Sequence, residues 1–285
     1  MKTDNPDIKS PEGVTLVLGG TGKTGRRVAE RLQARGVATR IATRSGTPSF
    51  DWNDRTTWNA ALDGVTAAYI TYAPDLAIPG ATEAIQAFVG QAVASGVQRL
   101  VLLSGRGEEE AQRCERIVQE SGIEWTVVRS SWFNQNFSEG EFLGMVLDGA
   151  ITLPAADVPE PFVDVNDIAD VAVAALTDDG HNGEIYEVTG PRMLTFTDVA
   201  KEISRAAGRE VQFIQVPKDA FAAGIAESGA PGEIAWLLNY LFETVLDGRN
   251  AYVCDGVQRA LGRAPTDFAD YARRIAASGV WRLAA

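Results

Sequence analysis

Residues 14–34, which read VTLVLGGTGKTGRRVAERLQA, decide the fold. The stretch begins with the short apolar run Val14–Leu18, which is typical of a buried strand in a parallel sheet. Glycines follow at positions 19, 20, 22 and 25, and a helical pattern begins after Gly22. A glycine spacing that lies between a strand and a helix predicts a dinucleotide site.

The glycines matter because a side chain in this turn would hold a pyrophosphate away from the backbone N–H groups. The helix that follows begins with unpaired N–H donors, which suit an anion. The predicted cofactor contacts in this segment are Gly19, Gly20, Thr21, Gly22, Lys23, Thr24 and Gly25. A tight turn without a ligand is the alternative. A P-loop is excluded, because its pattern requires a glycine where Val17 stands.

The end of the second predicted strand, residues 38–43, bears on the choice of cofactor. NAD-binding units carry an acidic residue about 20 residues after the glycines, where it binds the ribose 2′-hydroxyl. Here Arg44 takes that place, and no acid follows before Asp51. Arg44 can pair with a 2′-phosphate and Ser45 can donate to it, so NADP(H) is favoured and NAD(H) stays the alternative. An exposed arginine without a ligand is the other interpretation. Asp51 is expected near the adenine.

The rest of the chain alternates strands with helices. Strands are predicted at residues 66–72, 97–104, 124–129 and 185–188, with helices at 81–94, 108–120 and 168–176. This alternation predicts an α/β fold with a doubly wound parallel sheet. Ligands lie beyond the carboxyl ends of such strands. The further predicted cofactor contacts are therefore Thr71, Tyr72, Ala73, Ser104, Ser130 and Ser131.

A segment rich in aromatic and amide side chains, SSWFNQNF, follows the strand at 124–129. Rings offer flat apolar surface and amides fix orientation, as a substrate pocket requires. The predicted pocket residues are Trp132, Phe133, Asn136 and Phe137, and a helix over residues 221–245 is expected to close the other side with Trp236 or Tyr240. The alternative is that these aromatic residues form the joint between two domains.

Two domains are predicted from these segments. Residues 13–130 and about 162–190 form the nucleotide-binding domain. Residues 131–161 and 191–285 form a smaller, mostly helical substrate domain.

Composition excludes several classes of function. The 285 residues carry a net charge of −12, which disfavours nucleic acid and anionic membranes as partners. One histidine and two cysteines without a C-x-x-C pattern predict no metal site and no disulfide framework. The N-terminus lacks the apolar region of a signal peptide and no apolar run reaches about 18 residues, so a cytoplasmic location is expected.

Five segments in this order, LVLGGTGKTGRRVAERL, ESGIEWTVVRSSWFNQNF, PFVDVNDIADVAVAAL, GEIYEVTGP and TDFADYARRIA, resemble the NmrA-like family of atypical short-chain dehydrogenase/reductases. The resemblance implies a Rossmann domain, a small C-terminal substrate domain and NAD(P) in the cleft between them. The family includes quinone and isoflavone-type reductases, and also redox-sensing regulators without evident turnover.

The chain departs from the short-chain dehydrogenase pattern at its catalytic pair. Those enzymes use Tyr-x-x-x-Lys, with tyrosine as the acid. Between Ser104 and Arg129 this chain has neither residue type, and the resemblance places Arg106 and Glu110 near the expected positions. Proton transfer is then expected from Ser104, Tyr72, Asn134 or water.

Two functions follow from these observations. The first is an NAD(P)-dependent oxidoreductase that acts on a flat apolar molecule, quinone-like or polycyclic aromatic, because a quinone needs less acid catalysis from the protein. Arginine supplies 21 of the 26 basic residues, which hints at a GC-rich genome and, with it, a tailoring step in aromatic polyketide (antibiotic) biosynthesis. The second is a non-catalytic NAD(P)-sensing regulator that acts through a protein partner. The missing Tyr and Lys favour the regulator and the aromatic segment favours the enzyme, which we prefer. A homodimer stays open.

Overall fold

A six-stranded parallel sheet forms the centre of the computed structural model, which describes residues 13–155 and 157–283. The strands lie in the order β2-β1-β3-β4-β5-β7. Their bounds are β1 Val14–Leu18, β2 Thr39–Ala42, β3 Val65–Ile70, β4 Arg99–Gly105, β5 Glu124–Ser130 and β7 Glu184–Val188. Every neighbouring pair is parallel, so the six carboxyl ends share one edge of the sheet. The predicted doubly wound α/β fold is confirmed.

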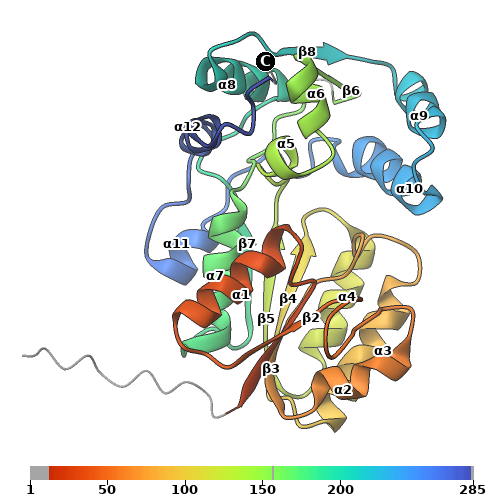
Figure 1. The fold of residues 1–285 in the computed structure, drawn as a ribbon, viewed down its shortest axis with the longest axis vertical. Helices are drawn as coiled ribbons and strands as arrows, with labels where there is room; N and C mark the ends of the chain where they lie inside the picture. The colour runs from red at the N-terminus through yellow and green to blue at the C-terminus, as the bar shows by residue number, and fades with distance from the viewer. Residues whose placement is uncertain (1–12, 156, 284–285) are drawn as a thin grey trace, which may run out of the picture.

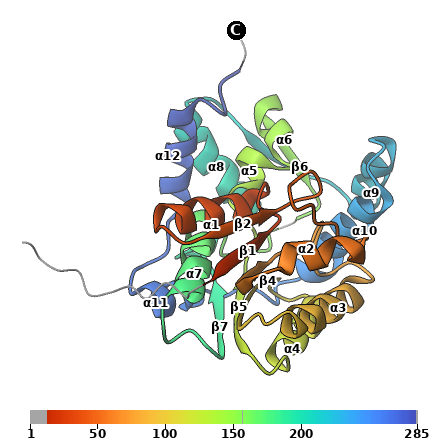
Figure 2. The same ribbon diagram turned by 60° about the horizontal axis from the view of Figure 1, so that its bottom comes forward.

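Helices cover both faces of this sheet (Figures 1 and 2). One layer contains α1 Lys23–Ala34, α7 Val165–Thr177 and α11 Gly256–Leu261, and the other contains α2 Trp58–Leu62 after the short 3₁₀ turn Arg55–Thr57, α3 Ala81–Ala94 and α4 Glu109–Gln119. Strand β1 shows why both layers form: Leu16 and Leu18 pack with α2, α3 and α4, whereas Val17 packs with α1 and α7. None of the described helices has both the length and the apolarity that a bilayer crossing requires.

A second unit lies beyond one end of the sheet (Figure 1). It contains α5 Asn136–Glu139, α6 Leu143–Asp148, α8 Phe196–Ala207, α9 Lys218–Glu227, α10 Gly232–Tyr240, the π-helical turn Leu241–Val245 and α12 Phe268–Ser278, with the strand pair β6 Ala150–Leu153 and β8 Gln212–Gln215. Buried phenylalanine rings dominate its core, among them Phe137, Phe162, Phe196 and Phe268.

Two features differ from the sequence-based expectation. The helix expected over residues 221–245 is divided, because Gly229 has a φ of +71° and Pro231 cannot donate a backbone hydrogen bond, so α9 ends before α10 begins. Helix α11 lies inside the predicted substrate domain, but Val257 and Leu261 pack on α7 and β7 of the sheet domain. The chain therefore returns to the sheet domain after residue 245.

Candidate functional site

The glycine loop lies where the strand order reverses, between β1 and its neighbours β2 and β3. Gly19 has a φ of +60°, which favours glycine. A Cβ on Gly20 would lie 2.3 Å from Ile41 of β2, and one on Gly25 would lie 2.3 Å from the Gly19 carbonyl oxygen. The loop thus packs closely against both the sheet and α1, and a side chain at position 20 or 25 would clash with these neighbouring atoms.

The first turn of α1 presents unpaired backbone donors. Gly22 is the N-cap, and no side chain caps this helix end. Thr24 is buried within the first turn. Four N–H groups at the start of a helix lack intrahelical acceptors, and with the helix dipole they favour an anion. The loop and the helix end therefore fit a pyrophosphate, as the sequence predicts.

Arg44 and Ser45 follow β2 at the same edge of the sheet, and both are exposed. Within the described residues Arg44 has no hydrogen-bond or ion-pair partner. Asp51, in contrast, is half-buried and its carboxylate accepts from the Asn53 backbone N–H at 2.9 Å. Arg44 can therefore bind a phosphate, whereas Asp51 holds a turn beside the predicted adenine position.

The residues after β3 lie next to the glycine loop. A Cβ on Gly19 would lie 2.8 Å from Thr71 Oγ1, so these two residues approach closely. The Thr71 carbonyl accepts from the indole of Trp52 at 3.2 Å, and the Tyr72 ring lies 4.9 Å from that of Trp52. Tyr72 and Thr71 are half-buried and Ala73 is exposed. Burial is the main cause that raises the pKa of Tyr72.

The hydroxyl of Ser104 is occupied by an internal ion-pair network. Ser104 Oγ donates to Glu115 of α4 at 2.6 Å, and Arg129 binds the same carboxylate through two nitrogens at 2.9 and 2.5 Å. Arg129 also donates to Glu187 of β7 at 2.7 Å. Ser104 is buried and its proton points to Glu115, so its predicted roles as proton donor and cofactor contact are not supported by the geometry.

Glu108 and Asp75 form a carboxyl pair beside β4. The Glu108 side chain folds over Gly105, where a Cβ would lie 2.3 Å from its carboxyl oxygen. Burial, and next the charge of Asp75, raise the pKa of Glu108 well above its usual range, while burial raises that of Asp75. Each carboxyl therefore disfavours a negative charge on the other.

Ser130 and Ser131 leave β5 in different directions. Ser130 Oγ donates to the backbone carbonyl of Ser104, near the end of the neighbouring strand β4, at 3.1 Å. Ser131 Oγ donates to Glu160 at 3.2 Å. Glu160 is fully buried, and burial raises its pKa to about 7. Its other oxygen, Oε1, has no hydrogen-bond partner among the described residues.

The aromatic segment after Ser131 divides between the two units. Trp132 is half-buried against Phe242 of the second unit, with ring centroids 5.1 Å apart, whereas Phe133 packs on the sheet domain. Asn134 is fully buried; its N–H donates to the Val163 carbonyl at 2.8 Å, and neither atom of its amide side chain has a partner in the described part of the chain. The predicted role of Asn134 stays a prediction.

Two predicted pocket residues have other partners. Phe137 is fully buried among Phe142, Phe162 and other rings, so it belongs to the core of the second unit rather than to a pocket wall. The Asn136 amide oxygen accepts from Lys23 Nζ at 3.1 Å, and therefore faces the start of α1.

Helix α10 supplies the facing aromatic residues. Trp236 is 41% exposed and stacks on Tyr240 with centroids 5.2 Å apart. Tyr240 and Leu237 pack against the α3–α4 layer of the sheet domain. Burial, and next the charge of Glu108, raise the pKa of Tyr240. The predicted wall residues thus lie near the β3 and β4 ends of the sheet edge.

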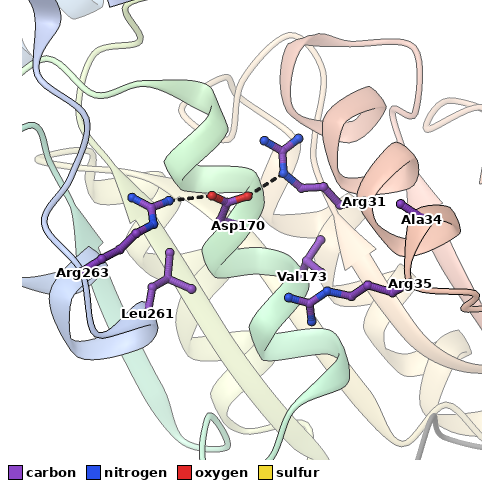
Figure 3. A pocket seen from close by; sticks show the side chains of 7 residues that line it. All are labelled: Arg31, Ala34, Arg35, Asp170, Val173, Leu261 and Arg263. Atoms are coloured by element: carbon purple, nitrogen blue, oxygen red, sulfur yellow. Dashed lines mark hydrogen bonds and ion pairs between the residues drawn. The ribbon is translucent and has the colours of Figure 1, made fainter. Parts of the chain in front are cut away.

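A surface groove of about 460 Å³ between α1, α7 and α11 is separate from this edge. Figure 3 shows Arg31 and Arg263 reaching Asp170 from opposite sides, with Nε of Arg31 2.5 Å from the carboxylate. Arg35 binds Thr177 and Asp178. The three arginines that line the groove, Arg31, Arg35 and Arg263, are all engaged in ion pairs, and we assign the groove no ligand.

Metal and thiol chemistry find no support in the described residues. These residues contain no group of three His, Cys, Asp or Glu side chains arranged to hold a metal ion. Cys114 and Cys254 are free, and burial raises the pKa of each thiol to about 11.

Sequence reasoning missed Glu160, Glu108 and Asp75. Glu160 stands between two prolines in a stretch that carries no periodic pattern. The signal that could have singled it out is an acidic residue in an otherwise apolar context, PEPFV, just before a buried helix.

Comparison with known proteins agrees with this architecture. The model of the NmrA-like family matches residues 11–272. Agroclavine dehydrogenase of Claviceps fusiformis is 31% identical over 279 residues, which cover 90% of this chain and 95% of that protein. The NAD(P)H azoreductase of Xenophilus azovorans is 29% identical over 292 residues, covering 92% of this chain and 98% of that protein.

The solved structures that resemble this fold include an NADPH-dependent quinone oxidoreductase from Escherichia coli, with a TM-score of 0.76 and 20% identity over 92% of this chain and 99% of that one. The curated relatives named above are oxidoreductases, which supports an oxidoreductase assignment. From the family match and the extent of these alignments, we conclude that the chain belongs to the NmrA-like family.

Proposed function

We propose that the protein is an NADP(H)-dependent oxidoreductase that acts on a flat apolar molecule of the quinone or polycyclic aromatic class. The observation that carries the proposal is the position of two anion sites on adjacent strands. The glycine loop and uncapped α1 follow β1, and Arg44, which has no partner among the residues that the structure describes, follows β2. This pair suits the pyrophosphate and the 2′-phosphate of one dinucleotide. NAD(H) would lack the second contact.

The chain's own residues would hold the cofactor along the sheet edge. Gly19, Gly20 and Gly25 allow the loop to pack closely on the protein, whereas a Cβ on Gly22 would meet only the Gly19 carbonyl oxygen at 3.2 Å, so Gly22 leaves room for the pyrophosphate over the helix end. Thr71 to Ala73 line the next strand end. Ser131 lies at the end of β5, where the other end of an extended dinucleotide would reach. When bound, a nicotinamide cofactor supplies hydride transfer; the protein binds and orients the reactants and excludes water.

The aromatic residues support the class of substrate. Trp132 and the Trp236–Tyr240 stack present flat ring surfaces near this edge, on which an aromatic substrate can pack. Names among the related proteins, a quinone oxidoreductase and an azoreductase, point to conjugated substrates as well. A tailoring step on an aromatic polyketide is the finer form of this proposal.

A regulator that senses NAD(P) through a protein partner is the second candidate. Two observations favour the regulator. The Ser104 hydroxyl donates to Glu115, and the chain has no Tyr or Lys between positions 104 and 129. The NmrA structure, described as a negative transcriptional regulator in complex with NAD, shares this fold with a TM-score of 0.69 at 17% identity.

Stopped-flow absorbance of NADPH separates the two candidates. The enzyme is expected to oxidise NADPH only after addition of a quinone or polycyclic ketone from a broad panel. Tight NADPH binding by calorimetry without turnover on the whole panel would favour the regulator. Absence of binding heat with NADPH, NADP, NADH and NAD would refute both.

A further inference from the structure

We propose that Glu160, acting through the hydroxyl of Ser131, supplies the proton of the reduction. The inference rests on the proposed oxidoreductase function and adds the acid that the missing Tyr-x-x-x-Lys pair leaves unassigned.

The position of Ser131 brings it to the reacting end of the site. Going along the sheet, β5 is the third strand from β1, in the order β1-β3-β4-β5. At a strand spacing of about 4.8 Å, the end of β5 lies about 14 Å from the glycine loop. A dinucleotide whose 2′-phosphate lies at β2 and whose pyrophosphate lies at β1 extends in this direction. Ser131 follows β5 directly, and its N–H donates to the Val188 carbonyl at 3.1 Å, which fixes its backbone.

The backbone of Glu160 is held equally firmly. Glu160 and Leu194 exchange two backbone hydrogen bonds of 2.9 Å each. Pro159 and Pro161 flank the glutamate and restrict its backbone angles. Val163 then donates to the Trp132 carbonyl at 2.9 Å, so the segment that bears Glu160 runs beside the segment that leaves β5. The carboxyl group is thereby preorganised next to Ser131.

The surroundings of the Glu160 carboxyl suit proton donation. It is fully buried, with Oε2 3.2 Å from Ser131 Oγ and with Oε1 lacking a partner among the described residues. Burial raises its pKa to about 7; the guanidinium of Arg106 and the Ser131 hydrogen bond oppose the shift, and the Asp247 carboxylate adds to it. A group with a pKa near the working pH is an efficient acid.

The proton reaches the substrate oxygen in two linked transfers. As the carbonyl or quinone carbon–oxygen π pair moves onto oxygen during reduction by NADPH, that oxygen takes the hydroxyl proton of Ser131. Ser131 Oγ takes the carboxylic proton of Glu160, and the carboxylate left behind is reprotonated from water. Ser104 differs from Ser131 in its partner: both hydroxyls donate to a glutamate, but the Glu115 carboxylate is bound by two nitrogens of Arg129. Glu115 is therefore engaged as an acceptor, and among the described residues Ser104 has no acid beside it from which to regain a proton. Glu108 interacts with Asp75, whose charge raises the pKa of Glu108, and so belongs to a different carboxyl pair.

The kinetic test uses 9,10-phenanthrenequinone and NADPH between pH 5.5 and 9. Wild-type kcat/KM should fall tenfold per pH unit above about pH 7. Glu160→Gln and Ser131→Ala should each lower kcat about 100-fold, and Glu160→Gln should lose the pH dependence. Glu108→Gln is the matched control, a second buried carboxyl at the same edge, and should keep the wild-type midpoint. If Glu160→Gln keeps the profile, or Glu108→Gln abolishes it, the proposal is wrong.

A second readout needs no turnover. Infrared difference spectra should show a protonated carboxyl band that disappears with a midpoint near pH 7. The band should be absent from Glu160→Gln. In Ser131→Ala its midpoint should rise, because a hydrogen bond to the carboxylate is lost. The raised pKa of Glu108 gives a separate protonated carboxyl band, which Glu160→Gln should keep and Glu108→Gln should lose. A band with a midpoint near pH 7 that persists in Glu160→Gln would overturn the assignment.

Calorimetry with NADPH keeps the two proposals distinguishable. Glu160→Gln should bind NADPH as wild type does, since Glu160 contacts none of the anion sites. If wild type itself fails to bind, the proposed function is wrong and this inference falls with it, whatever the infrared midpoint.

Discussion

Lys23 and Asn136 join the glycine loop to the second unit, with Nζ donating to Oδ1 over 3.1 Å between residues 113 positions apart. Arg26 and Arg27 of the same helix end bind Glu139 at 3.1 and 2.5 Å. The first turn of α1, where we propose the pyrophosphate binds, is therefore also a contact between the two units.

Replacement of Asn136 tests this contact. Burial lowers the pKa of Lys23, because the charged ammonium is partly removed from water. The ammonium therefore depends on hydrogen-bond acceptors within the protein, such as the Asn136 amide oxygen. Asn136→Leu removes one, and should lower the free energy of unfolding by about 1–3 kcal/mol in urea titrations. Asn136→Asp, the matched variant, offers a carboxylate in the same place and should be at least as stable as wild type near pH 7. Equal losses for the two variants would contradict the contact.

Gly22 and Gly25 should respond differently to substitution. A Cβ on Gly22 meets only the Gly19 carbonyl oxygen, at 3.2 Å, whereas one on Gly25 would lie 2.3 Å from that oxygen. Gly22→Val should therefore fold and lose NADPH binding, because its branched side chain occupies the space over the helix end. Gly25→Ala should lower the melting temperature, since the loop and α1 must separate. NADPH affinity and stability of the two variants are measured by calorimetry and thermal unfolding. Full NADPH affinity in Gly22→Val would show that the pyrophosphate does not bind over this helix end.

Arg44 should control the choice of cofactor. Arg44→Glu removes a charge-assisted contact to the 2′-phosphate and should weaken NADP binding by about 1.5–3 kcal/mol, with a far smaller effect on NAD. Arg205→Glu on α8 makes the same change of net charge in the second unit and serves as the control. Equal losses of both cofactors in Arg44→Glu would show that the guanidinium does not meet the phosphate.

Substitutions of Phe137 and Trp236 should distinguish a role in stability from a role in substrate binding. Phe137→Ala opens a cavity in a fully buried ring cluster and should cost about 3–5 kcal/mol of unfolding free energy. Trp236 is 41% exposed, so Trp236→Ala should change stability by less than about 1 kcal/mol while raising KM for a quinone. An unchanged KM would remove α10 from the pocket.

Glu160 should make stability depend on pH. Its pKa rises from 4.5 to about 7 on folding, so the folded state binds the proton more tightly and the stabilisation is present below pH 4.5 and lost as pH rises through 7. Compared with Glu160→Gln, wild type should lose about 3 kcal/mol across this window in urea titrations. A constant difference would indicate an ordinary pKa.

The sequence predicts the sheet domain well because its signals are local. Val14–Leu18 is a short, mostly apolar strand that is buried on both faces, and Ala81–Ala94 is an amphipathic helix that ends at Ser95-Gly96. Both were expected at these bounds, because each depends on neighbours within a few residues. Arg44 falls at the strand end for the same reason.

The partners of the site residues depend on distant segments and could not be predicted. Phe137 and Asn136 are adjacent in the sequence, yet one lies in a ring cluster and the other meets Lys23, 113 residues away. Ser104 binds Glu115 only because α4 packs against β4 and brings Glu115 next to Ser104. Burial of Glu160 requires Ser131 and Leu194 on either side of it. A spacing pattern contains none of these relationships.

The return of α11 to the sheet domain has a mechanical consequence. The chain passes between the two units near residues 131, 161 and 190 and again on each side of α11, so five backbone segments connect the units. Five separate connections restrain the relative motion of the two units more strongly than a single linker would. Neither unit is a contiguous stretch of the chain, so a single proteolytic cut would not release either one.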